Sequence, residues 1–389
     1  MGEVVKEVTR NDPTSEAPIM MITANNGFIE QSERYAFDNA GESLKKYILL
    51  QKGELAYNHG ASKLRPFGSC FALTTAESAR IPFVYHCFSA ENQNAEFLSI
   101  ELNGSEVESQ LRKIVSSGAR MDGLLNISFD EYSTVTVLLP DIKEQEHIAD
   151  FFRNLDHLIT LHQRKFDKLQ VLKKAMLEKM FPKNGSSVPE IRFKGFTDAW
   201  EQRKLSEMCG TFEYGLNAAA KEFDGKNKYI RITDIDDASR EFLLSDLSSP
   251  DICLDGMSKY LLSSGDIVFA RTGASVGKTY IYRENDGIVY FAGFLIRAKV
   301  NQDNDAEFVF QSTLSPSYEK YIRITSQRSG QPGVNAQEYG EYDLFAPSKE
   351  EQQRIGHFLR GIDSLITLHQ RELEKLQNIK KSMLEKMFV

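Results

Sequence analysis

Residues 144–181 (EQEHIADFFRNLDHLITLHQRKFDKLQVLKKAMLEKMF) return as residues 351–388 (EQQRIGHFLRGIDSLITLHQRELEKLQNIKKSMLEKMF). The two copies start 207 positions apart and agree at 24 of their 38 positions. A period of this length is too long for a solenoid built from short repeats. The sequence therefore indicates a duplicated half-molecule, in which each repeated segment follows a far more divergent segment.

Each copy of the repeat is predicted to be one long helix, because its apolar residues recur three and four positions apart. In the first copy they are Ile148, Phe152, Leu155, Ile159, Phe166, Leu169, Met176 and Met180, and in the second Ile355, Leu359, Ile362, Ile366, Leu373, Leu376, Met383 and Met387. A helix of this length would span roughly 57 Å, whereas globular helices average about 11–12 residues. Two such helices can pack on each other, or each can be buried in its own domain.

We expect the first arrangement, and six apolar residues are predicted to pair the helices: Leu155, Ile159, Leu169, Ile362, Ile366 and Leu376. His162 and His369 occupy equivalent positions in this seam, within the shared run LITLHQR. A polar residue in a helix seam commonly fixes the register of the pair. We prefer that role for these histidines to a catalytic or metal-binding one.

The divergent segments share a skeleton. Residues 52–62 (KGELAYNHGAS) parallel residues 264–275 (SGDIVFARTGAS), and each predicts a turn, a short strand and a glycine-containing loop. Residues 132–140 (YSTVTVLLP) parallel residues 339–347 (YGEYDLFAP), which predicts a closing strand before each long helix. The two segments are therefore expected to be related mixed α/β domains with different surfaces.

Composition excludes several classes of protein. The 389 residues are 41% hydrophobic with a net charge of −8, typical of a globular chain, and no apolar run is long enough for a membrane span or a signal sequence. The acidic charge disfavours nucleic-acid binding overall, but phosphate contact requires only a local basic surface. Four scattered cysteines lack metal-ligand spacing, so we expect reduced thiols and a cytoplasmic protein.

Catalytic motifs are also missing from the sequence. Residues 273–279 (GASVGKT) resemble a phosphate-binding loop but have three residues between the glycines, where that motif needs four. The Asn/Asp-Pro-Pro-aromatic tetrapeptide of amino-methyltransferases does not occur, and neither do other common catalytic signatures. We therefore expect no catalytic residue and no metal site in this chain.

The duplicated LITLHQR…KKxMLEKMF helices, the paired GE/GD strand–loop motifs and the segment Phe193-Lys-Gly-Phe196…Trp200 closely resemble the specificity (S) subunits of type I restriction–modification systems. The likeness extends over essentially the whole chain. One feature departs from it: residues 188–203 introduce the second domain, but Met1 already aligns with Leu205, so the first domain has no such introduction. Members of the family usually have this segment, which helps to close their pseudo-twofold structure.

The resemblance implies an α+β fold with two target-recognition domains and an antiparallel coiled coil made by the two repeated helices, an internal pseudo-twofold duplication. Five regions are predicted: domain 1 (1–143), helix 1 (144–182), a linker and lead-in segment (183–204), domain 2 (205–350) and helix 2 (351–389). Each domain would read one half of a split double-stranded DNA sequence. The helices would set the spacing and dock the methyltransferase subunits.

Partners and cofactors follow from the same resemblance. The chain would be non-catalytic by itself and would assemble with two methyltransferase (M) subunits, and then with two restriction (R) subunits, to form a type I endonuclease and adenine methyltransferase. S-adenosylmethionine, ATP and Mg²⁺ would be used by those partners and not by this chain. The polar flanks of the helix pair are the expected docking surface for the M subunits. The alternative is a coiled-coil adaptor that binds a protein ligand at each of its two heads.

Candidate DNA contacts are the donor-rich loops after the GE/GD strand and before the closing strand, because loops commonly carry binding residues. In domain 1 they are Asn58, His59, Lys63, Arg65, Arg120 and Asn126; in domain 2 they are Arg271, Thr272, Ser275, Lys278, Arg328, Gln331 and Asn335.

Overall fold

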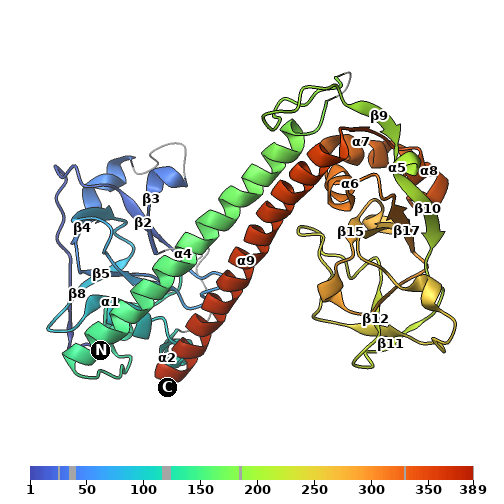
Figure 1. Ribbon diagram of the computed structural model, residues 1–389. Helices are drawn as coiled ribbons and strands as arrows, with labels where there is room; N and C mark the ends of the chain where they lie inside the picture. Colours follow the sequence, from blue (N-terminus) through green and yellow to red (C-terminus); the bar gives the residue numbers. More distant parts are fainter. Residues whose placement is uncertain (25–26, 35–40, 116–123, 184–185, 328–329, 389) are drawn as a thin grey trace. The chain divides into compact units, whose positions relative to one another are not determined.

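The computed structural model describes the whole chain except residues 25–26, 35–40, 116–123, 184–185, 328–329 and 389 (Figure 1). The chain forms two compact units. Unit 1 contains residues 1–161 and 373–389, and unit 2 contains residues 162–372. The two long helices, α4 (Ile142–Lys179) and α9 (Lys349–Met387), each contribute one part to each unit.

In unit 1, the first part of α4 packs against the last part of α9. Ile148 and Phe152 are buried in a cluster that also contains Met383 and Leu384, since apolar faces of both helices meet there. About one turn further along α4 from Phe152, Oδ1 of Asp156 lies 2.5 Å from Nζ of Lys380 on α9.

In unit 2, the last part of α4 packs against the first part of α9. Leu177 belongs to a core cluster together with Ile355 and Leu359, while Lys173 pairs with Asp363. Within each unit, rising residue numbers on α4 meet falling numbers on α9. The predicted antiparallel coiled coil is therefore confirmed.

The remainder of unit 1 is a small α+β domain. Its strands are β1 (Val5–Glu7), β2 (Met20–Thr23), β3 (Gly27–Glu30), β4 (Ile48–Gln51), β5 (Leu55–Asn58), β6 (Ser69–Ala72), β7 (Ser78–Ile81) and β8 (His86–Ala90), followed by helices α1 (Ala95–Glu101), α2 (Ser105–Ile114) and α3 (Phe129–Ser133). The main sheet has the order β1-β8-β5-β6. Leu55 and Phe88 form an adjacent pair in this sheet, and both are fully buried beneath the helices.

The remainder of unit 2 has more strands. They are β9 (Glu201–Lys204), β10 (Cys209–Tyr214), β11 (Ala220–Glu222), β12 (Lys228–Ile230), β13 (Ser248–Pro250), β14 (Asp266–Ala270), β15 (Thr279–Ile281), β16 (Val289–Phe291), β17 (Leu295–Val300) and β18 (Asp343–Ala346), with helices α5 (Leu205–Met208), α6 (Ala306–Ser312), α7 (Pro316–Thr325) and α8 (Ala336–Gly340). The main sheet has the order β10-β17-β14-β15. This order repeats that of unit 1 strand for strand, and all three strand pairs are antiparallel in each sheet.

The closing strand is present in only one unit. Residues 343–346 form β18, which pairs with β9 in the register Asp343↔Lys204 to Ala346↔Glu201. The prediction of a strand at residues 132–140 is wrong, because Tyr132 lies in α3 and the described residues that follow it form no ladder. A strand needs a partner, and here the backbone of Thr136 bonds instead with the side chain of Gln110, at 2.8 and 3.0 Å.

Candidate nucleic-acid interface

In unit 2, the two predicted loops lie side by side. The backbone N–H of Val334 donates to the carbonyl of Arg271 at 3.0 Å, and the N–H of Gly273 donates to the carbonyl of Pro332 at 3.0 Å. The loop after β14 and the chain leading into α8 thus form one backbone surface, although they are far apart in sequence.

Unit 1 builds the same arrangement with different side chains. The N–H of Leu125 donates to the carbonyl of His59 at 2.9 Å, and Gly60 forms an antiparallel bridge with Leu124. The loop after β5 therefore meets the chain leading into α3. Both units bring together the loops in which the candidate DNA contacts lie.

Arg271 is held by two aromatic rings. Its guanidinium carbon lies 5.1 Å from the ring centroid of Tyr214 and 5.9 Å from that of Phe294. Both rings are exposed, at 45% and 57% of their surface. Within the described part of the chain, the guanidinium makes no hydrogen bond or ion pair. A stacked guanidinium keeps its N–H groups free for another acceptor.

His59 occupies the position equivalent to Arg271 but points inward. Its side chain is 6% exposed, and its ring nitrogens lie 2.7 Å from the carbonyl oxygen of Leu125 and 2.6 Å from that of Val84. The ring therefore supports the loop from inside. This corrects the prediction that His59 contacts DNA, because its polar atoms are already engaged with the backbone.

Three other candidates in unit 1 also have identifiable positions. The Asn58 amide donates to the carbonyl of Ile22 at 3.1 Å and accepts from the N–H of Gly60 at 2.9 Å, so it shapes the turn. Arg65 donates to the carbonyl of Asn103 at 2.8 Å, and burial lowers the pKa of its guanidinium. Lys63 is exposed.

Asn126 is also exposed, whereas Arg120 lies outside the described residues. The described candidates that remain open to solvent in unit 1 are thus polar residues on the rim of the loop pair.

Two candidates of unit 2 support local structure. Asn335 caps α8 by accepting from the N–H of Glu338 at 2.9 Å, which is the role its residue type favours at a helix start. The ammonium group of Lys278 lies 2.5 Å from a carboxylate oxygen of Asp237.

The other candidates in unit 2 lie at the loop surface. Thr272 and Ser275 are half-buried and Gln331 is exposed, while Arg328 lies outside the described residues. Arg271 and Lys278 line different cavities, so the structure separates these two predicted cations.

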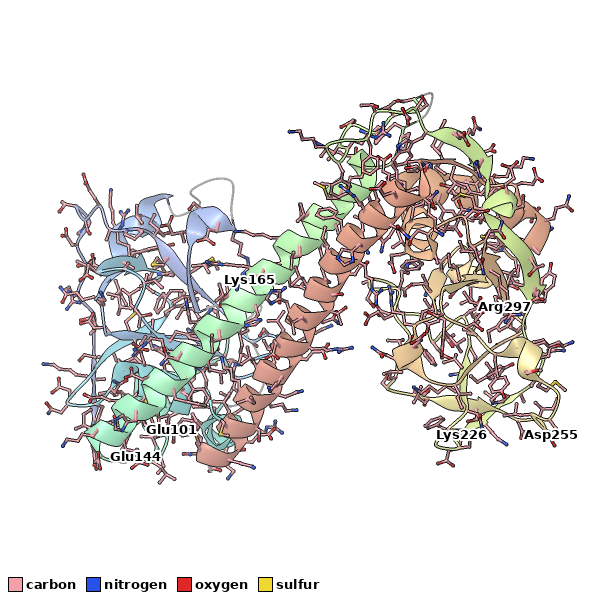
Figure 2. All side chains as sticks on the ribbon, in the orientation of Figure 1. Glu101, Glu144, Lys165, Lys226, Asp255 and Arg297 are labelled. Carbon is pink, nitrogen blue, oxygen red and sulfur yellow. The ribbon has the colours of Figure 1, made fainter. Side chains whose placement is uncertain are left out.

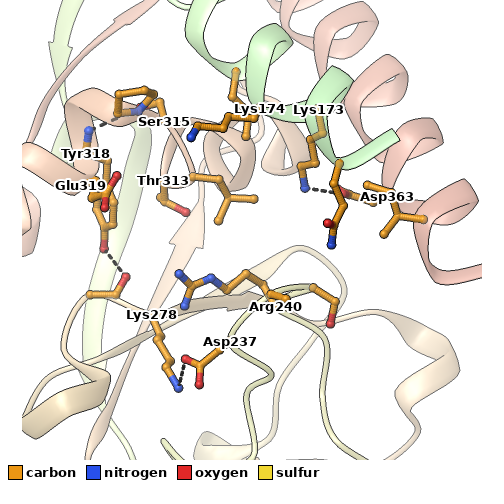
Figure 3. Close-up of a pocket in the computed structure, with 18 of the residues that line it drawn as sticks. Lys173, Lys174, Asp237, Arg240, Lys278, Thr313, Ser315, Tyr318, Glu319 and Asp363 are labelled. Carbon is orange, nitrogen blue, oxygen red and sulfur yellow. Dashed lines mark hydrogen bonds and ion pairs between the residues drawn. The ribbon is translucent and has the colours of Figure 1, made fainter. Parts of the chain in front are cut away.

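The cavity that contains Lys278 has a volume of about 580 Å³ (Figure 3). It is lined by both long helices, by residues 237–240 and by the start of α7. Of its four cations, Lys173 pairs with Asp363 and Lys278 pairs with Asp237, while Lys174 and Arg240 form no ion pair among the described residues. Because the equivalent loops of both units meet around Arg271 and His59, we place the candidate interface at the loop pair around Arg271 and not in this cavity.

The six residues predicted to pair the helices differ in burial. Leu155, Ile362 and Ile366 are buried, and Ile159, Leu169 and Leu376 are half-buried. The two seam histidines meet directly in unit 2, where His162 Nδ1 lies 3.1 Å from His369 Nδ1.

A second apolar stripe on the helices was missed by the sequence analysis. We call it the lateral stripe, and it comprises Phe151, Leu158 and Leu161 on α4 and Phe358, Leu365 and Leu368 on α9, all between 37% and 51% exposed. The two sets are equivalent in the repeat, because each α9 residue is 207 positions after its α4 counterpart. The polar flanks expected beside the seam are thus interrupted by large apolar side chains. The sequence does contain a signal for this stripe, because its members on each helix are seven and then three residues apart.

Side chains that could ligate a metal ion do not gather in the described part of the chain. None of them form a group of three or more His, Cys, Asp or Glu side chains that could hold a metal ion. Cys70, Cys87 and Cys209 are buried, which raises the pKa of each thiol above its ordinary value. Nor does any helix in the described ranges combine the length and apolar character that a membrane span requires.

Comparisons with known proteins agree with this geometry. Residues 197–378 match the family described as type I restriction modification DNA specificity domain. The MjaVIII specificity subunit of a type I restriction enzyme from Methanocaldococcus jannaschii is 24% identical over 299 residues, which cover 74% of this chain and 67% of that protein. The structure of a type I restriction–modification S subunit from M. genitalium aligns over 100% of this chain and 94% of its own, with 15% identity and a TM-score of 0.58.

Residues 197–378 thus form a type I restriction modification DNA specificity domain, and the chain as a whole is similar to the specificity subunit of a type I restriction enzyme. The structural likeness shows that the chain has the fold of such a subunit.

Proposed function

We propose that this subunit reads a split double-stranded DNA sequence, one half with each domain, and performs no catalysis itself. The observation that carries this proposal is the pair of equivalent loop surfaces. Both units join the loop after the central strand to the chain before a short helix, yet they place His59 and Arg271 at the equivalent point. A shared backbone with different side chains suits two different DNA half-sites, because base edges are read by side chains.

The lateral stripe supports two equivalent partner subunits. Exposed large apolar side chains beside a helix seam are typical of a surface that another protein covers. Each helix carries one copy of the stripe, so we propose that two M subunits dock, one on each copy. Two R subunits would then complete the endonuclease. S-adenosylmethionine, ATP and Mg²⁺ would be bound by these partners.

The helix pair would also determine the distance between the two half-sites. Both long helices continue without interruption from one unit into the other. A helix rises about 1.5 Å per residue, and DNA rises about 3.4 Å per base pair. We therefore propose that helix length selects the number of unread base pairs between the half-sites.

Selection from a DNA library tests the proposal. The chain would be reconstituted with its M subunit and mixed with duplexes that carry two randomised segments at varied separations. We expect the retained DNA to contain two short fixed sequences at one constant separation. Enrichment of a single continuous sequence, or of none, would reject the proposal. In the second case an adaptor for protein ligands would be the better account.

A further inference from the structure

We propose that Arg271 reads a guanine in the half-site of domain 2, and that Tyr214 and Phe294 are positioning residues that hold its guanidinium for this contact. The inference rests on the proposed DNA-reading function and deepens it, since it specifies one base and the group that recognises it.

Three adjacent strands deliver these side chains to one place. Tyr214 ends β10, and it lies opposite Ile296 of β17. Phe294 directly precedes β17, while Arg271 directly follows β14, the strand on the other side of β17. The backbone N–H of Arg271 donates to the carbonyl of Phe294 at 3.0 Å. The sheet register, and not chance contact of loops, therefore brings the arginine to the two rings.

The tyrosine is itself fixed in position. Its hydroxyl accepts from the backbone N–H of Ala336 at 3.3 Å, which ties it to the chain leading through α8. The next residue, Gly215, is so close to the neighbouring backbone that an added Cβ would lie 2.1 Å from the carbonyl oxygen of Ala292. Tyr214 thus stands at a tightly packed end of β10, and its ring gives Arg271 a defined support.

Arg271 differs from neighbouring arginines in the partners of its N–H groups. Arg297 on β17, labelled in Figure 2, is 3% exposed; it donates to the carbonyls of Leu261 and Lys259 and pairs with Glu213. Arg231 pairs with Asp234 at 2.8 Å. Arg271 has aromatic contacts but, within the described residues, no acceptor for its N–H groups.

This arrangement favours guanine among the possible acceptors. An arginine that presents two parallel N–H groups matches O6 and N7 of guanine in the major groove, which is the commonest specific contact between a side chain and a base. Stacking on aromatic faces restricts the orientation of the guanidinium plane without occupying its donors. A contact with a single phosphate oxygen would need no such fixed orientation, whereas the paired contact with guanine requires one.

The experiment repeats the library selection with variants of the complex that contains the M subunit. Wild-type protein should retain a guanine at one position of one half-site. Arg271→Lys keeps the charge but loses the paired donors, so we expect the preference for guanine at that position to fall by about 5- to 150-fold. Tyr214→Leu and Phe294→Leu should each weaken the same preference by a smaller factor. The other half-site should not change.

Lys226→Ala provides a matched control, because it removes one exposed positive charge from the same unit (Figure 2). It should leave every base preference unchanged. If Arg271→Lys and Arg271→Ala lower retention equally for all sequences, Arg271 contacts phosphate and the guanine assignment is overturned, while the proposed function stands. If the variants leave both retention and preference unaltered, the assignment is also overturned. If wild-type protein selects no sequence, the proposed function itself fails.

Discussion

Domain 1 and domain 2 use one backbone frame in opposite ways at a single position. His59 and Arg271 both follow the central strand of a four-stranded sheet, and both lie in a loop bonded to the chain before a short helix. His59 is buried against two carbonyl oxygens, whereas the guanidinium of Arg271 lies over two exposed rings. The frame fixes where a side chain begins, and the side chain and its neighbours decide whether it supports the loop or faces a ligand.

In the repeated helices, by contrast, the exposed side chains of the two copies are alike. The lateral stripe has the same apolar residues at equivalent positions, and its two copies have similar exposure. Surfaces that would meet two identical partners have therefore remained alike, while the loops that would meet different DNA sequences have diverged. Substitutions in the stripe and in the loops test this contrast.

The largest effect is expected at the lateral stripe. Leu158→Asp should remove one M subunit from the assembly and Leu365→Asp should remove the other, because a carboxylate in an apolar interface loses its water without gaining a partner. The double variant should bind none. Native mass spectrometry of the purified complex measures the number of subunits directly.

His157→Asp and Ser364→Asp are the controls, since both are exposed helix residues that lie next to the stripe and are equivalent in the repeat. They should retain both M subunits. If Leu158→Asp and Leu365→Asp also retain two M subunits, the stripe is not the docking surface.

An intermediate effect is expected on stability, and it should differ between the two domains. His59→Ala should lower the free energy of unfolding by about 1–3 kcal/mol, because the carbonyls of Leu125 and Val84, the first of them buried, lose their polar neighbour. Arg271→Ala should cost less than about 1 kcal/mol, since it loses only contacts with exposed rings. Urea denaturation of both variants measures the difference. Equal losses in stability would break the contrast between a supporting and a presenting side chain.

The smallest effect is expected for folding stability at acidic pH. Burial, His162 and Lys165 lower the pKa of His369. The unfolded chain therefore binds this proton at a higher pH than the folded protein does, and stability present at neutral pH is lost as the pH falls through the lowered pKa. Between pH 7.5 and 5.5, the Tm of the wild type should therefore fall slightly more than that of His369→Asn. Identical decreases in thermal scans would show that the histidine pair does not affect stability.

The sequence predicted the helices and the sheet skeleton because their signals are local. Residues such as Ile362 and Ile366 recur at the spacing of a seam, and the turn before β14 is marked by Gly265-Asp266. The closing strand of domain 1 was predicted incorrectly, because a strand depends on a partner as well as on its own residues. Domain 2 supplies that partner as β9, whereas residues 135–140 pair with none of the described strands.

The candidate site was predicted only in outline. The loops could be located, since both copies share the glycine-containing motif. The inward orientation of His59 and the stacking of Arg271 could not, because both depend on contacts distant in sequence, from Val84 in one case and from Tyr214 and Phe294 in the other. Helical spacing did contain the signal of the lateral stripe, but a polar flank was assumed.

If the two domains read DNA independently on a shared frame, exchanging one domain should change only one half of the recognised sequence. The most direct measurement replaces residues 205–346 with the equivalent domain of another family member and determines the methylated sequences in a strain that carries the chimaera and its M subunit. We predict that one half of the recognised sequence changes, while the other half and the spacing are retained. A change in both halves, or in neither, would contradict the account.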